Sequence, residues 1–217
     1  MLNSIKSENM KNNFFVVLIS LMPFFLNAQE IKKTTQLGFT TTPNIAWMSS
    51  NGNSSFESAG SSSGFSYGII ADLGFSENYF FATGFTLTSL NSKATTETKE
   101  SKYHLQYIEI PLTLKLKSNV SKIGRLYGQF GLGTGIKVKA TEDYHTRGAA
   151  TGASDGVNIS KEVNLFRLGL IAGAGAEWKV ANLNILTGVT YNNGFTNVIK
   201  ESSRRNSYVA LNLGVFF

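Results

Sequence analysis

The sequence predicts an all-β fold, an eight-stranded antiparallel up-and-down transmembrane β-barrel. Three observations lead to this class. The chain ends in a strand-like segment with one apolar face, seven earlier segments show the same alternation, and the connections between them alternate between short and long. Alternate side chains of a strand point to opposite faces, so each such segment presents one apolar face and one small or polar face.

The C-terminal segment has the clearest pattern. Its apolar residues are separated by Ala210, Asn212 and Gly214, and the chain ends on an aromatic side chain. The apolar set, which we take as a C-terminal barrel signature, is Val209, Leu211, Leu213, Val215 and Phe217. An apolar terminal strand exposed to water invites aggregation, whereas a strand facing lipid does not. We therefore expect this segment to close the barrel by pairing with the first strand, near Gln36–Met48.

Period-two alternation predicts eight strands. They cover residues 35–48, 65–75, 79–90, 103–117, 125–139, 163–178, 183–195 and 207–217. Each segment is at least as long as the roughly 9–11 residues that a tilted strand needs to cross a bilayer. The predicted strands are thus long enough for a membrane-spanning barrel.

The predicted connections fall into two classes. Short ones occupy 76–78, 118–124 and 179–182, and long polar ones occupy 49–64, 91–102, 140–162 and 196–206. Outer-membrane barrels have short periplasmic turns and longer external loops. We therefore expect both ends of the barrel segment on the periplasmic side.

Composition agrees with this class and argues against nucleic-acid binding. Charged residues make up 16% of the chain, against roughly 25% in ordinary soluble domains, and 21 residues are glycine. The net charge is +6, but no Lys/Arg run exceeds two residues, so no basic stripe follows a phosphate backbone. The chain has no cysteine. We expect no cofactor.

The start of the chain has the pattern of a secretory signal peptide. Lys11 precedes an apolar run at 14–26, which is too short to span a bilayer as a helix, and Ala28 follows. We expect a signal peptide at 1–28 and an outer-membrane β-barrel domain at 29–217, with Met1 and Met10 both open as the start. The expected location is the outer membrane of a Gram-negative cell.

The polar faces of the predicted strands carry charges that would point into the lumen. These are Asp72, Glu109, Lys115, Arg125, Lys137, Arg167 and Glu177. Charges enclosed in a narrow barrel must pair or keep water, so we interpret them as a structural network. Two alternatives stay open: a hydrated lumen that binds or transports a small solute or ligand, and a water-soluble lipocalin-like carrier.

Aromatic residues near strand ends predict two interfacial girdles. The outer girdle would contain Trp47, Tyr103 and Tyr191, and the periplasmic girdle Tyr79, Phe81, Trp178 and Phe217.

Catalytic and metal sites have little support in the sequence. A hydrolase would need Asp143 with His145, or His104 with a loop serine such as Ser54, and a metal would need Glu142, Asp143 and His145. No spacing favours any of these sets. We expect no catalytic residue and no metal site, and hence a structural, surface-interaction or accessory role.

Three segments resemble the outer-membrane β-barrel family of Bacteroidota-type bacteria whose members are often described as PorT-like. They are Tyr107–Lys115, with the motif residues Tyr107, Glu109 and Pro111, then Gly169–Trp178 and Tyr191–Val198. The resemblance implies an eight-stranded barrel in the outer membrane. Some members of that family are tied to secretion of surface proteins, and we do not transfer that role.

Pro111 also has a physical consequence. Proline has no N–H group to donate to a ladder hydrogen bond. A closed barrel has no edge strand where this loss is tolerated, so we expect a bulge or local distortion at Pro111. The expected partners are outer-membrane lipid and the barrel-assembly machinery, which would read Phe217. A role for other envelope or secretion proteins stays open, and no nucleic acid is expected.

Overall fold

The structure is a computed structural model that describes residues 35–50, 57–95, 99–122, 124–146, 153–200 and 203–217. All of these lie in the compact unit Thr34–Phe217. The predicted signal peptide at 1–28 lies outside the described residues.

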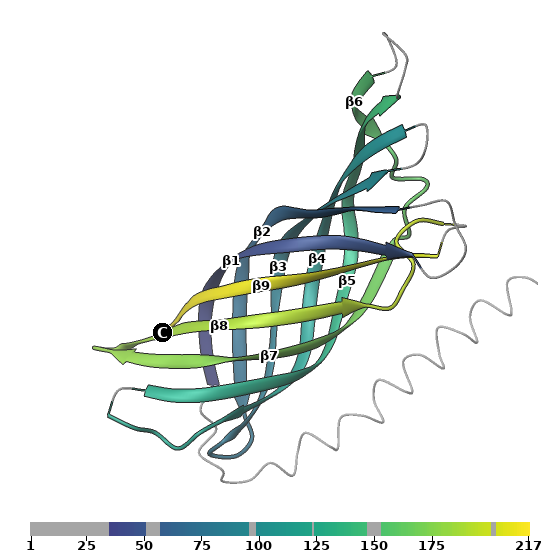
Figure 1. Ribbon diagram of the computed structural model, residues 1–217. Helices are drawn as coiled ribbons and strands as arrows, with labels where there is room; N and C mark the ends of the chain where they lie inside the picture. The colour runs from purple at the N-terminus through teal and green to yellow at the C-terminus, as the bar shows by residue number, and fades with distance from the viewer. Residues whose placement is uncertain (1–34, 51–56, 96–98, 123, 147–152, 201–202) are drawn as a thin grey trace, which may run out of the picture. The chain divides into compact units, whose positions relative to one another are not determined.

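The described chain forms nine strands (Figure 1). Their bounds are β1 Thr35–Ser50, β2 Glu57–Gly74, β3 Tyr79–Thr95, β4 Lys99–Lys117, β5 Gly124–Thr146, β6 Ala153–Asn158, β7 Phe166–Val180, β8 Leu183–Gly194 and β9 Arg204–Phe216.

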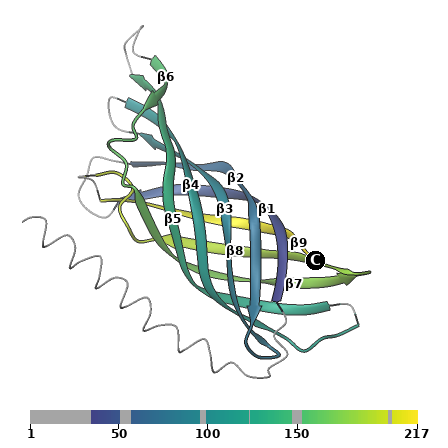
Figure 2. The ribbon, with the colours of Figure 1, turned by 180° about the vertical axis from the view of Figure 1, so that it is seen from behind.

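Eight of the strands close into an antiparallel barrel. The order β4-β3-β2-β1-β9-β8-β7-β5 is completed by pairing of β4 with β5, and β6 pairs with the outer part of β5. β9 pairs with β1 from Gly38↔Phe216 to Ser50↔Arg204, as expected for the closing strand. In Figure 2 the molecule is seen from behind, so the outer face formed by β3, β4 and β5 is turned toward the viewer. The predicted barrel is confirmed, with β6 as an additional strand.

The barrel has two different ends. The turn end carries the start of β1, the end of β9 and the connections 75–78, 118–123 and 181–182. The other end, called the loop end, carries the remaining connections. In the tightest turn Ala181 adopts a φ of 52°, a left-handed conformation that few non-glycine residues occupy. The predicted short connections are thus confirmed as turns.

All four predicted long loops are partly strand, and β9 begins at Arg204 inside the last of them. β2 begins at Glu57, β3 ends at Thr95, β4 begins at Lys99, and β5 runs to Thr146 before β6. Both faces of these extensions carry polar residues, so they lack the alternation that marks a strand in a sequence. We call the projecting part, residues 89–95, 99–106, 139–146 and 153–158, the outer sheet (Figure 1).

A β-bulge at Val138 sets the faces of the outer sheet. β4 and β5 pair at Tyr107↔Lys137 and then at Gln106↔Lys139, so Val138 is an extra residue on β5. Val138 and Lys139 are consequently both exposed, and the alternation of β5 is inverted beyond them. Glu142 therefore points inward instead of outward.

Pro111 interrupts the sheet without shifting its register. Pairing of β3 with β4 stops between Ala82↔Thr113 and Thr86↔Glu109, and the register is the same on both sides of the gap. The distortion predicted at Pro111 is therefore a gap in one ladder, since proline has no N–H to donate there. The bulge in β4–β5 pairing lies at Gln106/Tyr107 instead.

The outward faces of all eight barrel strands form a continuous apolar surface, which we call the apolar belt. Side chains such as Phe85 and Leu126 are 64% and 67% exposed. The belt consists of Leu37, Phe39, Ile45, Phe65, Tyr67, Ile69, Leu73, Tyr79, Phe81, Phe85, Ile108, Leu112, Leu114, Leu116, Leu126, Phe130, Leu132, Ile136, Val138, Phe166, Leu168, Leu170, Trp178, Leu183, Val189, Tyr191, Val209, Leu211, Leu213, Val215 and Phe217. Only a bilayer provides a matching solvent for such a surface. Within the described part of the chain, no helix is long and apolar enough to cross a membrane.

Candidate functional site

The barrel interior is filled in layers. From the turn end to the loop end these are a cluster of four charges, a small chamber, a second polar cluster and an apolar plug. We take these layers as the candidate functional site, because they decide whether the barrel can conduct or bind.

The turn-end cluster consists of Asp72, Lys115, Lys117 and Glu177. The Asp72 carboxylate accepts from Lys115 Nζ at 2.8 and 2.9 Å, and its Oδ2 also lies 2.8 Å from Lys117 Nζ. Lys117 Nζ lies 2.7 Å from Glu177 Oε1. The four side chains are at most 4% exposed. Two cations and two anions cancel, which is the condition for burying charge in a narrow lumen.

Neighbouring groups complete the coordination of Lys117. Its ammonium donates to Gln36 Oε1 at 2.6 Å and lies 4.1 Å from the centre of the Phe80 ring. The Phe216 ring lies 5.5 Å away on another side. Ring faces attract cations, so these aromatic side chains seal the lumen without leaving the charge unsolvated.

The second polar cluster, called the central cluster, is built around Arg167. Its guanidinium donates to Glu109 Oε1 at 2.9 Å, to Asn192 Oδ1 at 2.9 Å and to the Asn206 carbonyl at 3.0 Å. Tyr208 donates its hydroxyl proton to Glu109 Oε2 at 2.8 Å. Arg167 is 2% exposed, so the ion pair is isolated from solvent. The cluster links β4, β7, β8 and β9 across the lumen.

An apolar plug fills the lumen between the central cluster and the loop end. Side chains from the strands pack there against residues of the connections 159–165 and 195–200. The plug contains Ala46, Met48, Leu90, Ala94, Tyr103, Leu105, Tyr107, Ala140, Ile159, Val163, Val198, Tyr208 and Ala210. Lys137 holds the first connection in place by donating to the carbonyls of Ser160 and Val163. Folded connections thus close the loop end.

A chamber of about 120 Å³ remains between the two polar clusters. Hydroxyl groups from several strands line it, among them those of Thr42, Thr88, Thr113 and Thr190. Thr88 Oγ1 is buried without a hydrogen-bond partner in the protein. A polar space of this volume suits a few water molecules, since one water needs about 10–15 Å³ by this measure.

The structure separates the seven predicted lumen charges into groups. Asp72, Lys115 and Glu177 meet in the turn-end cluster, and Glu109 and Arg167 meet in the central cluster. Arg125 lies near the start of β5 and Lys137 lies past its middle, and both are only half-buried. Arg125 donates to the carbonyls of Ser118 and Glu77, which ties two turns together.

Lys117 belongs to the site although the sequence reasoning missed it. It shares its strand phase with Lys115 and Glu109, so period-two spacing could have identified it. Lys117 is the last residue of the predicted strand 103–117, next to the predicted turn 118–124.

The predicted aromatic girdles need one correction. Trp47 and Tyr191 stack at the loop-end limit of the belt with ring centres 6.2 Å apart, and Tyr79, Phe81, Trp178 and Phe217 are exposed toward the turn end. Tyr103 instead points inward, is 7% exposed and accepts a hydrogen bond from Arg204. It belongs to the apolar plug because it has the same phase as the lumen residues of β4.

The outward face of the outer sheet carries a chain of polar contacts. His104 Nδ1 lies 3.1 Å from Asn91 Oδ1, and His104 Nε2 lies 3.0 Å from Asp143 Oδ2. The Gly156 amide donates to Asp143 Oδ1 at 2.7 Å. The hydrogen bond from Gly156, supported by His104, lowers the pKa of Asp143 below its ordinary value. These contacts hold β3, β4, β5 and β6 in one sheet.

The catalytic and metal sets considered from the sequence are not assembled. Both nitrogens of His104 contact oxygen atoms, so neither faces a serine hydroxyl, and Ser54 lies outside the described residues. Among the residues that the structure describes, no three His, Cys, Asp or Glu side chains form a group able to hold a metal ion.

A closed barrel with an apolar belt defines the class of the protein: it is an integral β-barrel of the outer membrane. Residues 27–200 match the family model described as "Outer membrane protein beta-barrel domain". The chain belongs to this family.

Several solved outer-membrane proteins are similar in structure. Ail, the attachment invasion locus protein of Yersinia pestis, solved with the heparin analogue sucrose octasulfate, has 12% identity and a TM-score of 0.42, covering 84% of this chain and 99% of Ail. OprG from Pseudomonas aeruginosa has 10% identity and a TM-score of 0.43 (84% and 93% covered). Neisserial surface protein A has 15% identity and a TM-score of 0.40 (82% and 97%). No curated protein matches the sequence.

Proposed function

We propose that the protein is a sealed, non-catalytic outer-membrane barrel that holds the outer sheet at the cell surface as an interaction surface. The observation that carries this proposal is the filled lumen. Two polar clusters and an apolar plug lie in series along one narrow barrel, so a hydrated ion would have to break buried contacts to pass.

The outer sheet supports the second half of the proposal. Its strands continue those of the barrel, and the chain of contacts from Asn91 through His104 and Asp143 to Gly156 joins β3, β4, β5 and β6. A surface built on continuous strands is presented to a partner with little loss of entropy on binding. The alternation of short turns and long connections supports a position of this sheet outside the cell.

Conductance in planar bilayers tests the seal. Refolded protein that shows the gel-mobility difference between unheated and boiled samples should give no steps above background. Because the central cluster and the apolar plug still close the lumen, a variant with Lys115 and Lys117 both replaced by Ser, and Asp72 and Glu177 by Ala, should also give no steps. Protection of the belt from trypsin in the same lipid verifies that each protein is inserted. Stable ohmic steps from the unmodified protein would refute the sealed lumen.

The interaction surface needs a separate test. A photo-crosslinking amino acid at Lys93 of the outer sheet should capture an envelope or extracellular protein in native membranes, whereas the same amino acid at Lys122 of the turn end should not capture that protein. Equal capture at both positions would contradict a role of the outer sheet.

The chamber favours a second candidate function, the binding of a small polar solute. Its hydroxyl lining and the unpartnered Thr88 Oγ1 offer hydrogen bonds that the protein itself does not use. The exposed apolar belt, in contrast, does not suit a water-soluble lipocalin-like carrier.

Three narrower assignments complete the proposal. Within its family the chain fits the PorT-like members through Tyr107, Glu109 and Pro111, of which the first two lie in the lumen and the third at the ladder gap. The segment 1–28 serves as the signal peptide. The barrel-assembly machinery recognises the C-terminal strand with Val209, Leu211, Leu213, Val215 and Phe217.

A further inference from the structure

A groove of about 550 Å³ opens at the loop end of the barrel, between Lys137 of β5, the start of β7 with the connection before it, and the connection from β8 to β9. Leu165 and Phe166 form its apolar side and are 50% and 64% exposed. Because Phe166 belongs to the apolar belt, the groove lies where the belt gives way to polar surface. A membrane lipid at this height would place its headgroup beside the groove.

Two cations line the same groove. Lys137 is fixed by its bonds to the carbonyls of Ser160 and Val163, and the backbone of Lys200 is anchored by donation to the Glu162 carbonyl at 2.8 Å. Both lysines carry a positive charge and line the same groove, so their charges repel each other. Within the described part of the chain, neither ammonium pairs with a carboxylate. An anion between the two would turn this repulsion into attraction.

We propose that this groove binds the phosphorylated headgroup of a membrane lipid, with the phosphate between Lys137 and Lys200 and an acyl chain along Leu165 and Phe166. The apolar side favours a lipid over free phosphate, since inorganic phosphate has nothing to place there. The inference rests on the proposed orientation of the barrel, under which the lipid belongs to the outer leaflet.

Binding of phosphatidic acid, compared with diacylglycerol of the same chains, tests the site. The probe is the purified full-length barrel in mild detergent, with bound lipid counted by native mass spectrometry. Each lysine near a membrane surface contributes about fivefold to anionic lipid binding, so phosphatidic acid should bind about 25-fold more tightly than diacylglycerol. Lys200→Gln should lose about fivefold, and Lys200→Arg should retain the affinity.

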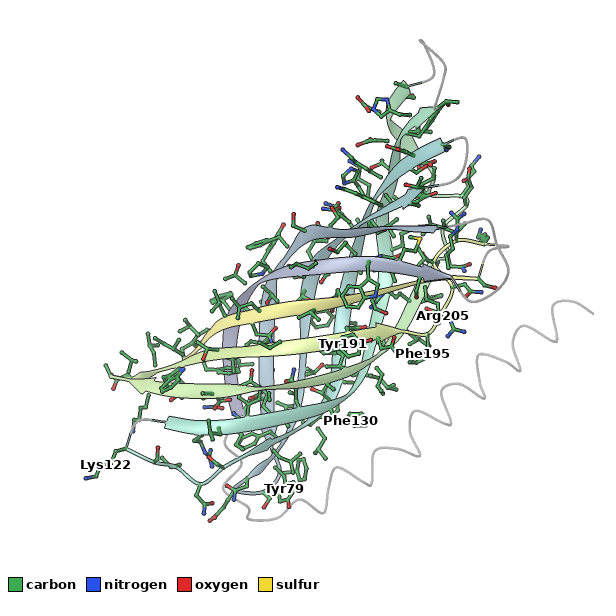
Figure 3. The ribbon with its side chains drawn as sticks, viewed as in Figure 1. Tyr79, Lys122, Phe130, Tyr191, Phe195 and Arg205 are labelled. Atoms are coloured by element: carbon green, nitrogen blue, oxygen red, sulfur yellow. The ribbon has the colours of Figure 1, made fainter. Side chains whose placement is uncertain are left out.

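Lys122→Gln is the matched control, because Lys122 is an exposed cation at the turn end (Figure 3). It should bind phosphatidic acid as the unmodified protein does. A second variant, Leu165→Asn, should weaken binding of phosphatidic acid and of diacylglycerol equally, so that the ratio of the two affinities stays the same. Each variant is first checked for the heat-dependent gel shift of a folded barrel.

Three results would overturn the proposal: equal binding of the two lipids, equal loss in Lys122→Gln and Lys200→Gln, or inorganic phosphate binding as tightly as phosphatidic acid. The last result would assign the groove to free phosphate. A missing gel shift in the unmodified protein would instead refute the barrel itself, and labelling of the turn end from outside the cell would refute its orientation.

Discussion

Glu109 and Arg167 form a buried ion pair in the middle of the lumen. Replacing one member of a buried pair leaves the other charged and unpaired, which costs about 3–5 kcal/mol. We therefore expect Glu109→Gln to lower the temperature at which the folded gel band disappears. Glu77→Gln, at an exposed turn position, is the control. Equal melting of the two variants would show that the pair has no structural role.

Lys117 should show strong coupling to Asp72. Lys117→Met leaves the turn-end cluster with one uncompensated negative charge, whereas Lys117→Met with Asp72→Asn is balanced by Lys115 and Glu177. The double variant should consequently be more stable than Lys117→Met alone, because contacting groups are not additive. Urea denaturation in lipid vesicles measures both. If the losses of stability from Lys117→Met and Asp72→Asn simply added, the four charges would not act as one cluster.

Asp143 carries the pH dependence of the outer sheet. Its pKa in the folded protein is lowered, so the carboxylate contributes stability above about pH 4, where an unfolded aspartate is ionised, and this stability is lost as pH falls through the lowered pKa. Hydrogen exchange of the Gly156 amide should therefore accelerate relative to that of barrel amides at acidic pH. Asp143→Asn should remove the acceleration, and an unchanged profile in this variant would contradict the assignment.

Among the elements, β5 determines how the outer sheet faces. Inserting one alanine between Thr141 and Glu142 would turn Asp143 and His145 inward and separate Asp143 from His104. We expect trypsin to cut the insertion variant after Lys102 or Lys139 while the belt stays protected. Deleting Val138 removes only the extra residue of the bulge, so Asp143 keeps its outward face and this control should resist cleavage. Resistance of the insertion variant would show that the register tolerates the change.

The sequence predicts the barrel strands well and the outer sheet poorly, for one physical reason. One face of β9 meets lipid, so apolar residues alternate with small ones along the strand, and this alternation is visible in the sequence. Its pairing with β1 follows because the barrel must close. Beyond the belt, residues such as Lys93 and Lys102 face water and the inner face is mixed, so the strand period disappears. The bulge at Val138 is a property of pairing between two strands, which one sequence does not display.

The same limit applies to the lumen. Alternation assigns Asp72, Lys115 and Glu177 to the inner face, but their contacts depend on the stagger of strands that are distant in sequence. The sequence prediction omits Lys117 from the lumen charges and assigns Tyr103 to the outer girdle; these two residues are the ends of the predicted strand 103–117, each next to a predicted connection. Because β4 runs from Lys99 to Lys117, its alternation assigns both side chains to the inner face.

At the scale of the whole molecule, a lipid-facing belt, a filled lumen and a projecting sheet form one continuous structure. The belt and the closed ladder explain how a chain without cysteine is stable outside the cytoplasm, since every barrel strand has two hydrogen-bonded neighbours. The filled lumen leaves the outer sheet as the part available to partners.

Cysteine accessibility tests this arrangement directly, because the chain has no cysteine of its own. Single variants Lys93→Cys, Thr88→Cys and Lys122→Cys are treated with a membrane-impermeant maleimide, first on intact cells and then after permeabilising the outer membrane. We predict labelling of Lys93→Cys on intact cells, of Lys122→Cys only after permeabilisation, and of Thr88→Cys only after unfolding. Rapid labelling of Thr88→Cys in the folded barrel would show that the lumen is open and contradict the sealed barrel.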